Sequence, residues 1–241
     1  MKIIFSPSKG MKYRELNNLK TEKQPFFLEK TEILVNAIQN ISKEKLGETM
    51  KIKGSLLDET FIRYKTFWNL PQYKAIELYN GVSFSNLEPE KYSPESVKYM
   101  LKYLIIFSAL YGALSPETLI HPYRLDMTIK IDNFQLYNYW KASVEKLFNK
   151  DEIILNLASS EFSKILDRKN YRVIDVEFRQ NCDGKLKNIS TEAKKMRGQL
   201  LNYLIKHQIT DLDLLKNFSQ NDYSLCNELS EGDKIFFIKN K

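Results

Sequence analysis

Residues 107–127 read Phe-Ser-Ala-Leu-Tyr-Gly-Ala-Leu-Ser-Pro-Glu-Thr-Leu-Ile-His-Pro-Tyr-Arg-Leu-Asp-Met and hold a tight turn, a helix start and a Pro-Tyr-Arg-x-Asp cluster. Upstream, Ser-Pro-Glu at 93–95 has a hydroxyl N-cap, a proline at the first helical position and an acid in the first turn. Ser-Pro-Glu at 115–117 repeats this pattern. Gly112 lies between the two and can adopt the positive φ that ends a helix. Residues 93–120 therefore predict a helix, a tight hairpin and a second helix.

Helix-hairpin-helix elements often bind a phosphate backbone, because free amide groups at a helix start attract anions. In this interpretation Tyr111 and Gly112 lie at a nucleic-acid surface. The alternative is a short connector between two core helices, which the spacing alone favours. Residues 31–50 have a second helix-turn-helix outline. The sequence leaves open which of the two segments contacts DNA.

The chain has 241 residues, with 37 Lys and Arg against 30 Asp and Glu and a net charge of +7. This length is enough for a substantial core in one large domain or two small ones. No linker rich in Gly, Ser or Pro divides the sequence. The excess of positive charge favours an anionic partner.

Cysteines and histidines are few and are not spaced as metal ligands: Cys182, Cys226, His121 and His207. We expect no metal site, no disulfide framework and no cofactor. The polar residues 6–9 interrupt the apolar start before a signal peptide could form, and no apolar run is long enough to span a bilayer. The sequence therefore predicts a cytoplasmic protein with no membrane partner.

A short apolar run at 2–5 is typical of a buried strand, and Ser-Pro-Ser-Lys-Gly follows it directly. Small hydroxyl groups, a lysine and a glycine after a strand can line an anion site. The spacing of a Walker loop is absent. Lys9 is therefore a candidate for binding an anion.

A second apolar run, at 153–157, predicts a buried central strand that turns into a helix. Asn156 interrupts this run, and a buried amide lowers stability unless it finds partners. Ser159 and Glu161 follow where a helix start offers unpaired amides. Ser159 could contact a ligand or could merely cap the helix.

The pattern at 190–207 predicts an amphipathic helix in which Lys194 and Arg197 lie beside the apolar stripe and Lys195 lies on the solvated face. Two inward cations in the first turns oppose the helix dipole, so the helix is expected to hold an anion or a buried carboxylate there. Gly198 would let a partner approach the helix backbone closely. The alternative is an internal salt bridge to Asp126, Glu161 or Glu177.

Seven short motifs stand in an order that resembles the YaaA family of bacterial peroxide-stress proteins, over essentially the whole chain. They are Ser6-Pro7-Ser8-Lys9, Tyr79-Asn80-Gly81, Ser108-Ala109-Leu110-Tyr111-Gly112, Pro122-Tyr123-Arg124-Leu125-Asp126-Met127, Leu136-Tyr137 with Trp140, Asn156-Leu157-Ala158-Ser159 with Glu161, and Ala193-Lys194-Lys195 with Arg197-Gly198. Each motif alone is weak, whereas seven in order are specific.

Four positions depart from the pattern of that family. Ala109 replaces a glycine, which weakens a close approach of phosphate to the turn. Ser115 stands where the family tends to have arginine, and this removes one candidate phosphate contact. Asp126 replaces glutamate and retracts the carboxylate by one methylene. Met196 replaces a small residue.

The resemblance implies an α+β fold in which helices flank a mixed sheet, as a single domain over residues 1–241. It also implies a basic cleft and a helix-hairpin-helix element. In function, it implies DNA binding linked to protection from oxidative damage and to recombinational repair. The resemblance does not establish any enzymatic reaction.

We therefore predict largely sequence-independent binding of double-stranded or structured DNA in a basic cleft. The predicted binding residues are Lys9, Tyr111, Gly112, Arg124, Lys194, Lys195 and Arg197. The alternative is an enzyme acting on a small anionic ligand, phosphorylated or nucleotide-like, in the same cleft. Its candidate catalytic residues are Tyr123, Arg124, Asn156, Ser159 and Glu161. A deep closed pocket would favour the enzyme, and an open groove of duplex width would favour DNA.

Overall fold

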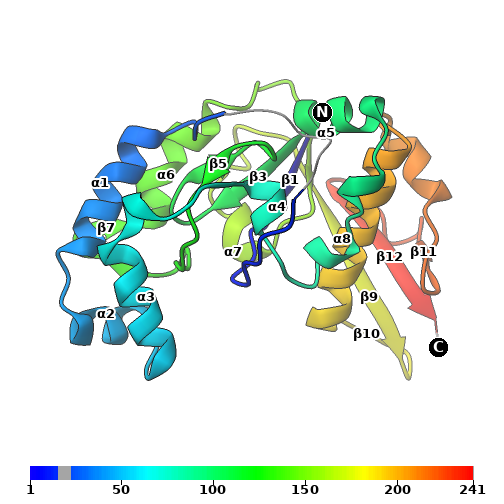
Figure 1. The fold of residues 1–241 in the computed structure, drawn as a ribbon. Helices are drawn as coiled ribbons and strands as arrows, with labels where there is room; N and C mark the ends of the chain where they lie inside the picture. The colour runs from blue at the N-terminus through cyan, green and yellow to red at the C-terminus, as the bar shows by residue number, and fades with distance from the viewer. Residues whose placement is uncertain (16–22, 241) are drawn as a thin grey trace.

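The structure is a computed structural model that describes residues 1–15 and 23–240. An eight-stranded sheet forms its centre (Figure 1), in the order β11-β12-β9-β8-β1-β3-β4, with β10 paired to β9. The strands are β1 (Lys2–Phe5), β3 (Leu104–Ser108), β4 (Gly112–Leu114), β8 (Ile154–Asn156), β9 (Val173–Cys182), β10 (Lys185–Lys187), β11 (Tyr223–Leu225) and β12 (Lys234–Asn240). The predicted mixed sheet is confirmed.

The middle of the sheet is parallel. Strands β12, β9, β8, β1 and β3 run in one direction, and the antiparallel strands β11 and β4 lie at the two ends. In β1, which pairs on both sides, Ile3, Ile4 and Phe5 are at most 1% exposed. Parallel strands are covered on both faces, which explains the continuous apolar runs of β1 and β8.

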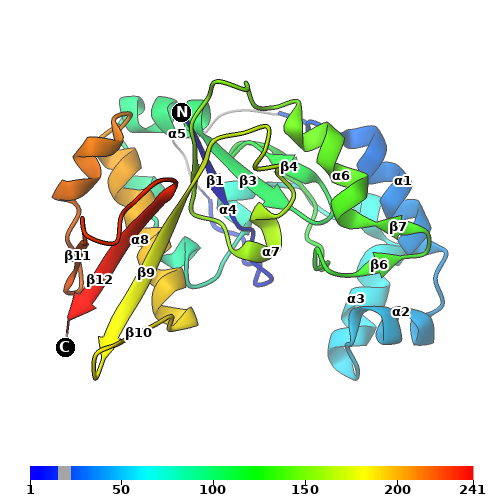
Figure 2. The same ribbon diagram turned by 180° about the vertical axis from the view of Figure 1, so that it is seen from behind.

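Helices flank the sheet on both faces. The helices are α1 (Leu28–Gln39), α2 (Lys43–Met50), α3 (Ser55–Lys65), α4 (Ala75–Leu78), α5 (Pro94–Tyr103), α6 (Leu136–Glu145), α7 (Ser160–Ser163) and α8 (Ser190–Lys206). Helix α8 lies on one face, where it packs against β9 and α5 (Figure 1), and α6 lies on the other, beside β4 (Figure 2). No helix in the described ranges is both long enough and apolar enough to cross a membrane.

Short elements complete the architecture. Two small two-stranded sheets form from β2 (Tyr73–Lys74) with β5 (Leu119–Ile120) and from β6 (Lys130–Ile131) with β7 (Phe134–Gln135). The short 3₁₀ helices are η1 (Phe67–Asn69), η2 (Phe84–Asn86), η3 (Pro89–Lys91) and η4 (Leu212–Asn217). Asp183 and Gly184 form the turn between β9 and β10, and both residues have positive φ.

Residues 93–120 differ from the prediction. The first helix is present as α5, but residues 104–114 form the hairpin of β3 and β4, and no helix starts at 115–117. The backbone N–H groups of Ala75 and Ile76 donate to the carbonyls of Thr118 and Pro116, which therefore belong to a turn that packs against α4. The predicted helix-hairpin-helix at 93–120 is wrong, because a short buried apolar run fits a strand as well as a helix.

The second outline, at 31–50, does consist of two helices. Helices α1 and α2 are joined by a short turn, and the Ser42 hydroxyl accepts a hydrogen bond from the Lys45 N–H as an N-cap. Lys51 ends α2 in the left-handed conformation at φ 54°. Its side chain is exposed beside the end of the helix.

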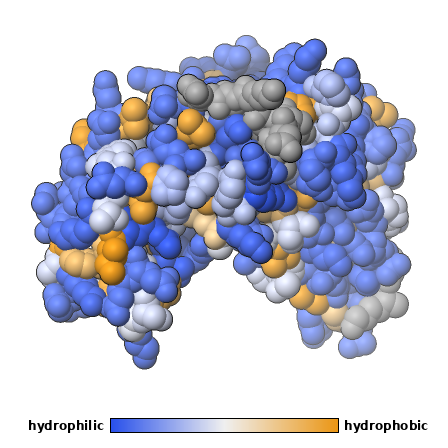
Figure 3. All heavy atoms as spheres, viewed as in Figure 1, coloured by the Kyte–Doolittle hydropathy of each residue, from blue (hydrophilic) through white to orange (hydrophobic). Residues whose placement is uncertain are grey.

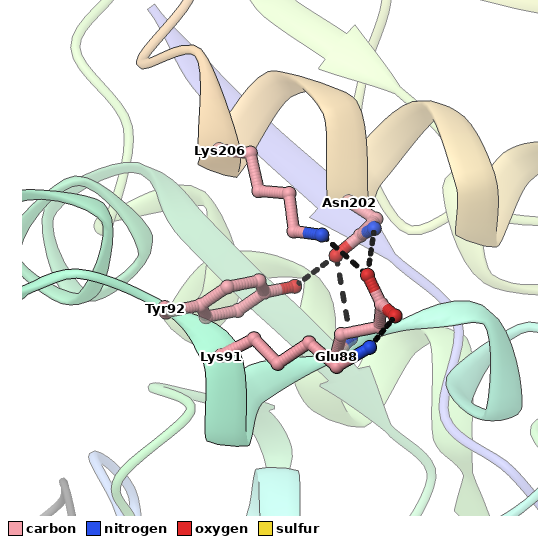
Figure 4. A network of polar contacts seen from close by, with 5 residues as sticks. All are labelled: Glu88, Lys91, Tyr92, Asn202 and Lys206. Carbon is pink, nitrogen blue, oxygen red and sulfur yellow. Dashed lines mark hydrogen bonds and ion pairs between the residues drawn. The ribbon is translucent and has the colours of Figure 1, made fainter.

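A polar network holds α8 to the η3 segment (Figure 4). The Glu88 carboxylate accepts hydrogen bonds from Lys206 on α8 and from Lys91, the latter at 2.6 Å. The Asn202 side-chain oxygen accepts a hydrogen bond from the Tyr92 hydroxyl at 2.8 Å. Hydrogen bonds from Lys206 and Lys91 lower the pKa of Glu88 to about 2.

We expect Glu88→Gln to lower the melting temperature near neutral pH by up to about 4 °C, since a partly exposed ion pair contributes about 1 kcal/mol or less. Because the pKa of Glu88 is lowered, its ion pairs contribute fully to stability above the ordinary glutamate pKa of 4.5. This contribution to stability is lost as the pH falls toward 2. In thermal unfolding experiments, the difference in melting temperature between Glu88→Gln and the wild type should therefore disappear as the pH is lowered. Glu90→Gln, on the same turn, is the control. A difference that persists at pH 2 would contradict this assignment.

Candidate functional site

The candidate site is a cavity of about 440 Å³ at the carboxyl ends of β1 and β8. The loop after β1 (residues 6–11) and the segment after β8 (residues 157–162) form two of its walls. Strands β1 and β8 are neighbours in the sheet. The next strand of this sheet along the chain after β1 is β3, which pairs with the outer side of β1, and the next strand after β8 is β9, which pairs with the outer side of β8. Ligands of open parallel sheets bind where the connections diverge in this way. We call this space the strand-end cavity.

The two loops are held together by hydroxyl groups. The backbone N–H of Ser159 donates to the Ser6 hydroxyl at 2.8 Å, and the Ser6 hydroxyl lies 3.2 Å from the Ser159 hydroxyl. Ser159 is the N-cap residue of α7, but its side chain makes no capping hydrogen bond. The hydroxyl of Ser159 therefore lines the cavity and serves the contact between the loops.

Asn156 lies beneath the cavity and not in its wall. Its side-chain N–H donates to Asp175 at 2.7 Å, and its side-chain oxygen accepts from the Ala158 N–H at 2.9 Å. Burial works to raise the pKa of Asp175, but hydrogen bonds from Arg168 and Asn156 outweigh it and the pKa is lowered. The predicted partners of the buried amide are thus present, and Asn156 positions the segment after β8.

Four predicted cations line the strand-end cavity: Lys9, Arg124, Lys194 and Arg197. Lys9 forms an ion pair with Asp126 at 2.7 Å. Arg124, Lys194 and Arg197 form no ion pair with any described carboxylate. The cavity therefore keeps unneutralised positive charge on two sides.

Arg197 is the most constrained of these cations. Its Nε atom is buried without a hydrogen-bond partner among the described residues, and burial lowers the pKa of its guanidinium, partly opposed by Glu177. Glu177 instead pairs with Arg179 at 3.1 Å. The internal salt bridge that was the alternative for Arg197 is not formed with Asp126, Glu161 or Glu177, so its guanidinium has no ionic partner among the described residues.

Gly198 allows the close approach that the sequence predicted. A Cβ atom at this position would lie 2.1 Å from the backbone oxygen of Ser83. The Ser83 hydroxyl also donates to the carbonyl of Lys194 at 2.9 Å. The loop at 80–84 therefore packs directly on α8 and forms the third wall of the cavity.

Tyr123 joins the cavity to a buried chain of hydroxyl groups. Its hydroxyl lies 2.7 Å from that of Ser108 and 2.8 Å from that of Tyr79. Burial raises the pKa of Tyr123 to about 12, so it stays protonated at neutral pH. Glu161 also lines the cavity, and its carboxylate accepts the backbone N–H of Met127 at 3.1 Å.

Three predicted binding residues lie outside the strand-end cavity. Tyr111 is 1% exposed, and its hydroxyl accepts a hydrogen bond from the His121 N–H at 3.0 Å. Gly112 has φ +72°, and a Cβ there would lie 2.6 Å from the ring of Trp140. The hairpin is therefore packed inside the molecule. Lys195 lies on α8 outside the cavity wall.

Two further cavities adjoin the first, of about 900 and 390 Å³, and all three share Lys9 and Arg124. Figure 3 shows the lower edge of the molecule hollowed between the part carrying α2 and α3 and the part carrying α8. We call this surface the basic hollow. Its positive side chains are Lys9, Lys45, Lys51, Arg63, Arg124, Lys130, Lys194 and Arg197.

Sequence reasoning missed two parts of this surface. Asn80 and Gly81 have no predicted role of their own, but they lie against the loop after β1, where the Ser8 hydroxyl donates to the Asn80 carbonyl at 2.9 Å. The cations of α2, α3 and β6 are single residues without a motif. Only the presence of Tyr79-Asn80-Gly81 among the motifs of the resembled family pointed to the segment at Asn80 and Gly81.

No group of three His, Cys, Asp or Glu side chains within residues 1–15 and 23–240 is arranged to hold a metal ion. The donors of the strand-end cavity are mainly hydroxyls, amides and cations. Such donors suit an anion better than a cation.

Comparisons with known proteins identify relatives that match nearly the whole chain. Residues 1–229 match the family model described as "Peroxide stress protein YaaA". A UPF0246 protein of Fusobacterium nucleatum is 42% identical over 99% of both chains. UPF0246 proteins of Rickettsia felis and Francisella philomiragia are 34% and 30% identical, and each match covers 99% of this chain and all of the relative.

We expect Asn156→Asp to lower the free energy of unfolding by about 3 kcal/mol, because a second carboxylate would face Asp175 in a buried position. Repulsion between the two carboxylates raises the pKa of the new carboxyl at position 156. The loss of stability is therefore complete at neutral pH and becomes smaller as acid protonates one of the two carboxyl groups. Urea unfolding near pH 7 and pH 5 measures both effects. Asn170→Asp, at an exposed position, is the control. Equal stability of the two variants at pH 7 would refute the positioning role of Asn156.

Proposed function

The chain belongs to the peroxide stress protein YaaA family, and from this premise we propose that it serves the peroxide stress response by binding double-stranded or structured DNA in the basic hollow. The match to the family model and the relatives support a role in peroxide stress. The contact with DNA is our inference from the shape and charge of the hollow.

The convergence of three cavities on Lys9 and Arg124 carries this proposal. Cations from α2, α3, β6, α8 and two loops line one concave surface, and they outnumber its carboxylates, which are Glu59, Asp126, Asp132 and Glu161. A surface of this kind binds phosphates by charge and releases counterions, with little preference for sequence. Binding should therefore weaken steeply as salt is added.

Helices α1 and α2 place part of this charge. The turn between them and the end of α2 line the second cavity, together with the β6 segment. Lys51 and Lys130 are exposed there, and neither forms an ion pair with a described carboxylate. They are the best candidates for direct phosphate contacts.

The alternative function is an enzyme acting on a phosphorylated or nucleotide-like substrate. The strand-end cavity supports it, since the cavity brings Tyr123, Ser159 and Glu161 together with unpaired cations. Its volume is within the range of small-molecule sites, roughly 300–1,000 Å³. The wider hollow around it favours DNA as the partner.

We expect the double substitution Lys51→Gln with Lys130→Gln to reduce duplex affinity and to lower the slope of log K against log salt by about 2, because each phosphate contact contributes about 0.9 to that slope. Fluorescence anisotropy of a labelled duplex over a salt series measures both quantities. The loss should be similar for duplexes of unrelated sequence.

The matched control is Lys98→Gln with Lys216→Gln, which removes the same charge from exposed positions on α5 and η4, outside the hollow. It should leave the slope within about 0.5 of the wild type, since neither lysine would lie at a phosphate. Equal effects of the two double variants would show that net charge alone decides binding, and the proposed surface would then be abandoned.

A further inference from the structure

We propose that the strand-end cavity binds a single nucleotide unit, with its base between apolar walls and its phosphate beside Arg197 and Lys194. The unit is either a free nucleotide or a nucleotide turned out of a duplex held in the basic hollow. The second form rests on the proposed DNA binding, whereas the first does not.

The size of the cavity limits what can enter it. A volume of about 440 Å³ holds a ligand of small-molecule size and excludes a double helix. A duplex in the hollow could therefore reach this space only with one nucleotide at a time. Enzymes that act on a base within a duplex use such pockets for an extruded nucleotide.

The walls of the cavity suit a base. The apolar residues in its lining include Phe5, Phe84, Phe162, Val82 and Leu157. Phe5 and Phe84 are in edge contact, with centroids 5.3 Å apart, and both are buried, so this wall is rigid. Apolar walls of this kind can accept a base because every base has an apolar face.

A few polar groups interrupt the apolar lining. The hydroxyls of Ser6, Ser8 and Ser159 come from the two loops at the strand ends, and Glu161 adds a carboxylate acceptor. Small-molecule sites combine apolar walls with a small number of placed polar groups in this way. Such groups could bind the edges of a base or the hydroxyls of a sugar.

Arg197 and Lys194 supply the charge for the phosphate. Both come from α8 and line the cavity beside the loop at 80–84. Arg197 makes no hydrogen bond to the described residues, although its Nε atom is buried. A buried guanidinium nitrogen without a partner lowers stability, and a phosphate beside this partly buried side chain would offer the missing acceptor.

The cavity opens toward the hollow. Lys9 and Arg124 line all three cavities, so they stand at the boundary between the strand-end cavity and the wider surface. The ion pair between Lys9 and Asp126 lies at this boundary and is partly exposed. A nucleotide leaving the duplex would pass these residues.

The first arm of the test uses duplexes with one 2-aminopurine, a fluorescent base that brightens when it leaves the stack, either paired with thymine or mismatched with cytosine. Protein is added until anisotropy shows that the duplex is saturated. With the wild-type protein we expect the fluorescence of 2-aminopurine to rise severalfold. The rise should be larger for the mismatched duplex, because a weakly paired base is easier to extrude.

Val82→Trp places a large side chain in the cavity from a residue that is 40% exposed, so the fold should tolerate it. We expect this variant to lose the rise at saturation. Leu229→Trp, at a residue that is 41% exposed and outside the cavity, is the matched control and should keep the rise.

The second arm measures binding of free deoxynucleoside monophosphates by calorimetry, with deoxynucleosides and inorganic phosphate as separate probes. If free nucleotides are the source, the monophosphate should bind at least 10-fold more tightly than either part, and Val82→Trp and Arg197→Met should each weaken it at least 10-fold. Binding of monophosphates without any binding of duplex would support the nucleotide site and reject the DNA proposal.

A duplex that binds with no rise in fluorescence, together with no binding of monophosphates, would overturn the nucleotide site and leave the DNA proposal standing. A rise that Val82→Trp does not reduce would also overturn it, because extrusion would then occur elsewhere. Absence of all three signals would reject both proposals.

Discussion

The hydrogen bond from the Ser159 N–H to the Ser6 hydroxyl ties together two loops that are 153 residues apart in the chain. Both loops begin at the carboxyl ends of parallel strands, β1 and β8, which are themselves paired. Parallel pairing brings these ends to the same edge of the sheet, and the divergence of the next connections leaves a space between them. The position of the candidate site therefore follows from the pairing of β1 with β8.

Charge is concentrated around this space at a cost to stability. Arg197 is desolvated without an ionic partner among the described residues, and Gly198, a poor helix former, stands in the third turn of α8. The glycine lets the Ser83 carbonyl reach the helix, which closes the cavity wall. Structures retain such costs where a ligand offsets them. An anion beside Arg197 is the simplest account of both features.

The sequence predicted the buried strands and the apolar stripe of α8 because each depends on local pattern. It placed Lys195 on the solvated face of α8 and Lys194 inward, whereas Lys195 is partly buried and Lys194 is exposed. It did not predict the strand at 104–108, since a short apolar run has no period that distinguishes a strand from the end of a helix. Tyr111 and Gly112 were placed at the surface for the same reason, although their hairpin packs against Trp140. Lys51 and Lys130 carried no signal at all, because an isolated lysine becomes part of a site only through the fold.

Lysine footprinting tests the central claim, that one concave surface gathers the charge that meets DNA. Acetylation of each lysine is measured by mass spectrometry with and without a saturating duplex. The account predicts protection of Lys9, Lys51, Lys130 and Lys194 by at least threefold, with Lys98 and Lys216 unchanged. Equal reactivity of both groups with and without DNA, or protection confined to Lys98 and Lys216, would contradict it.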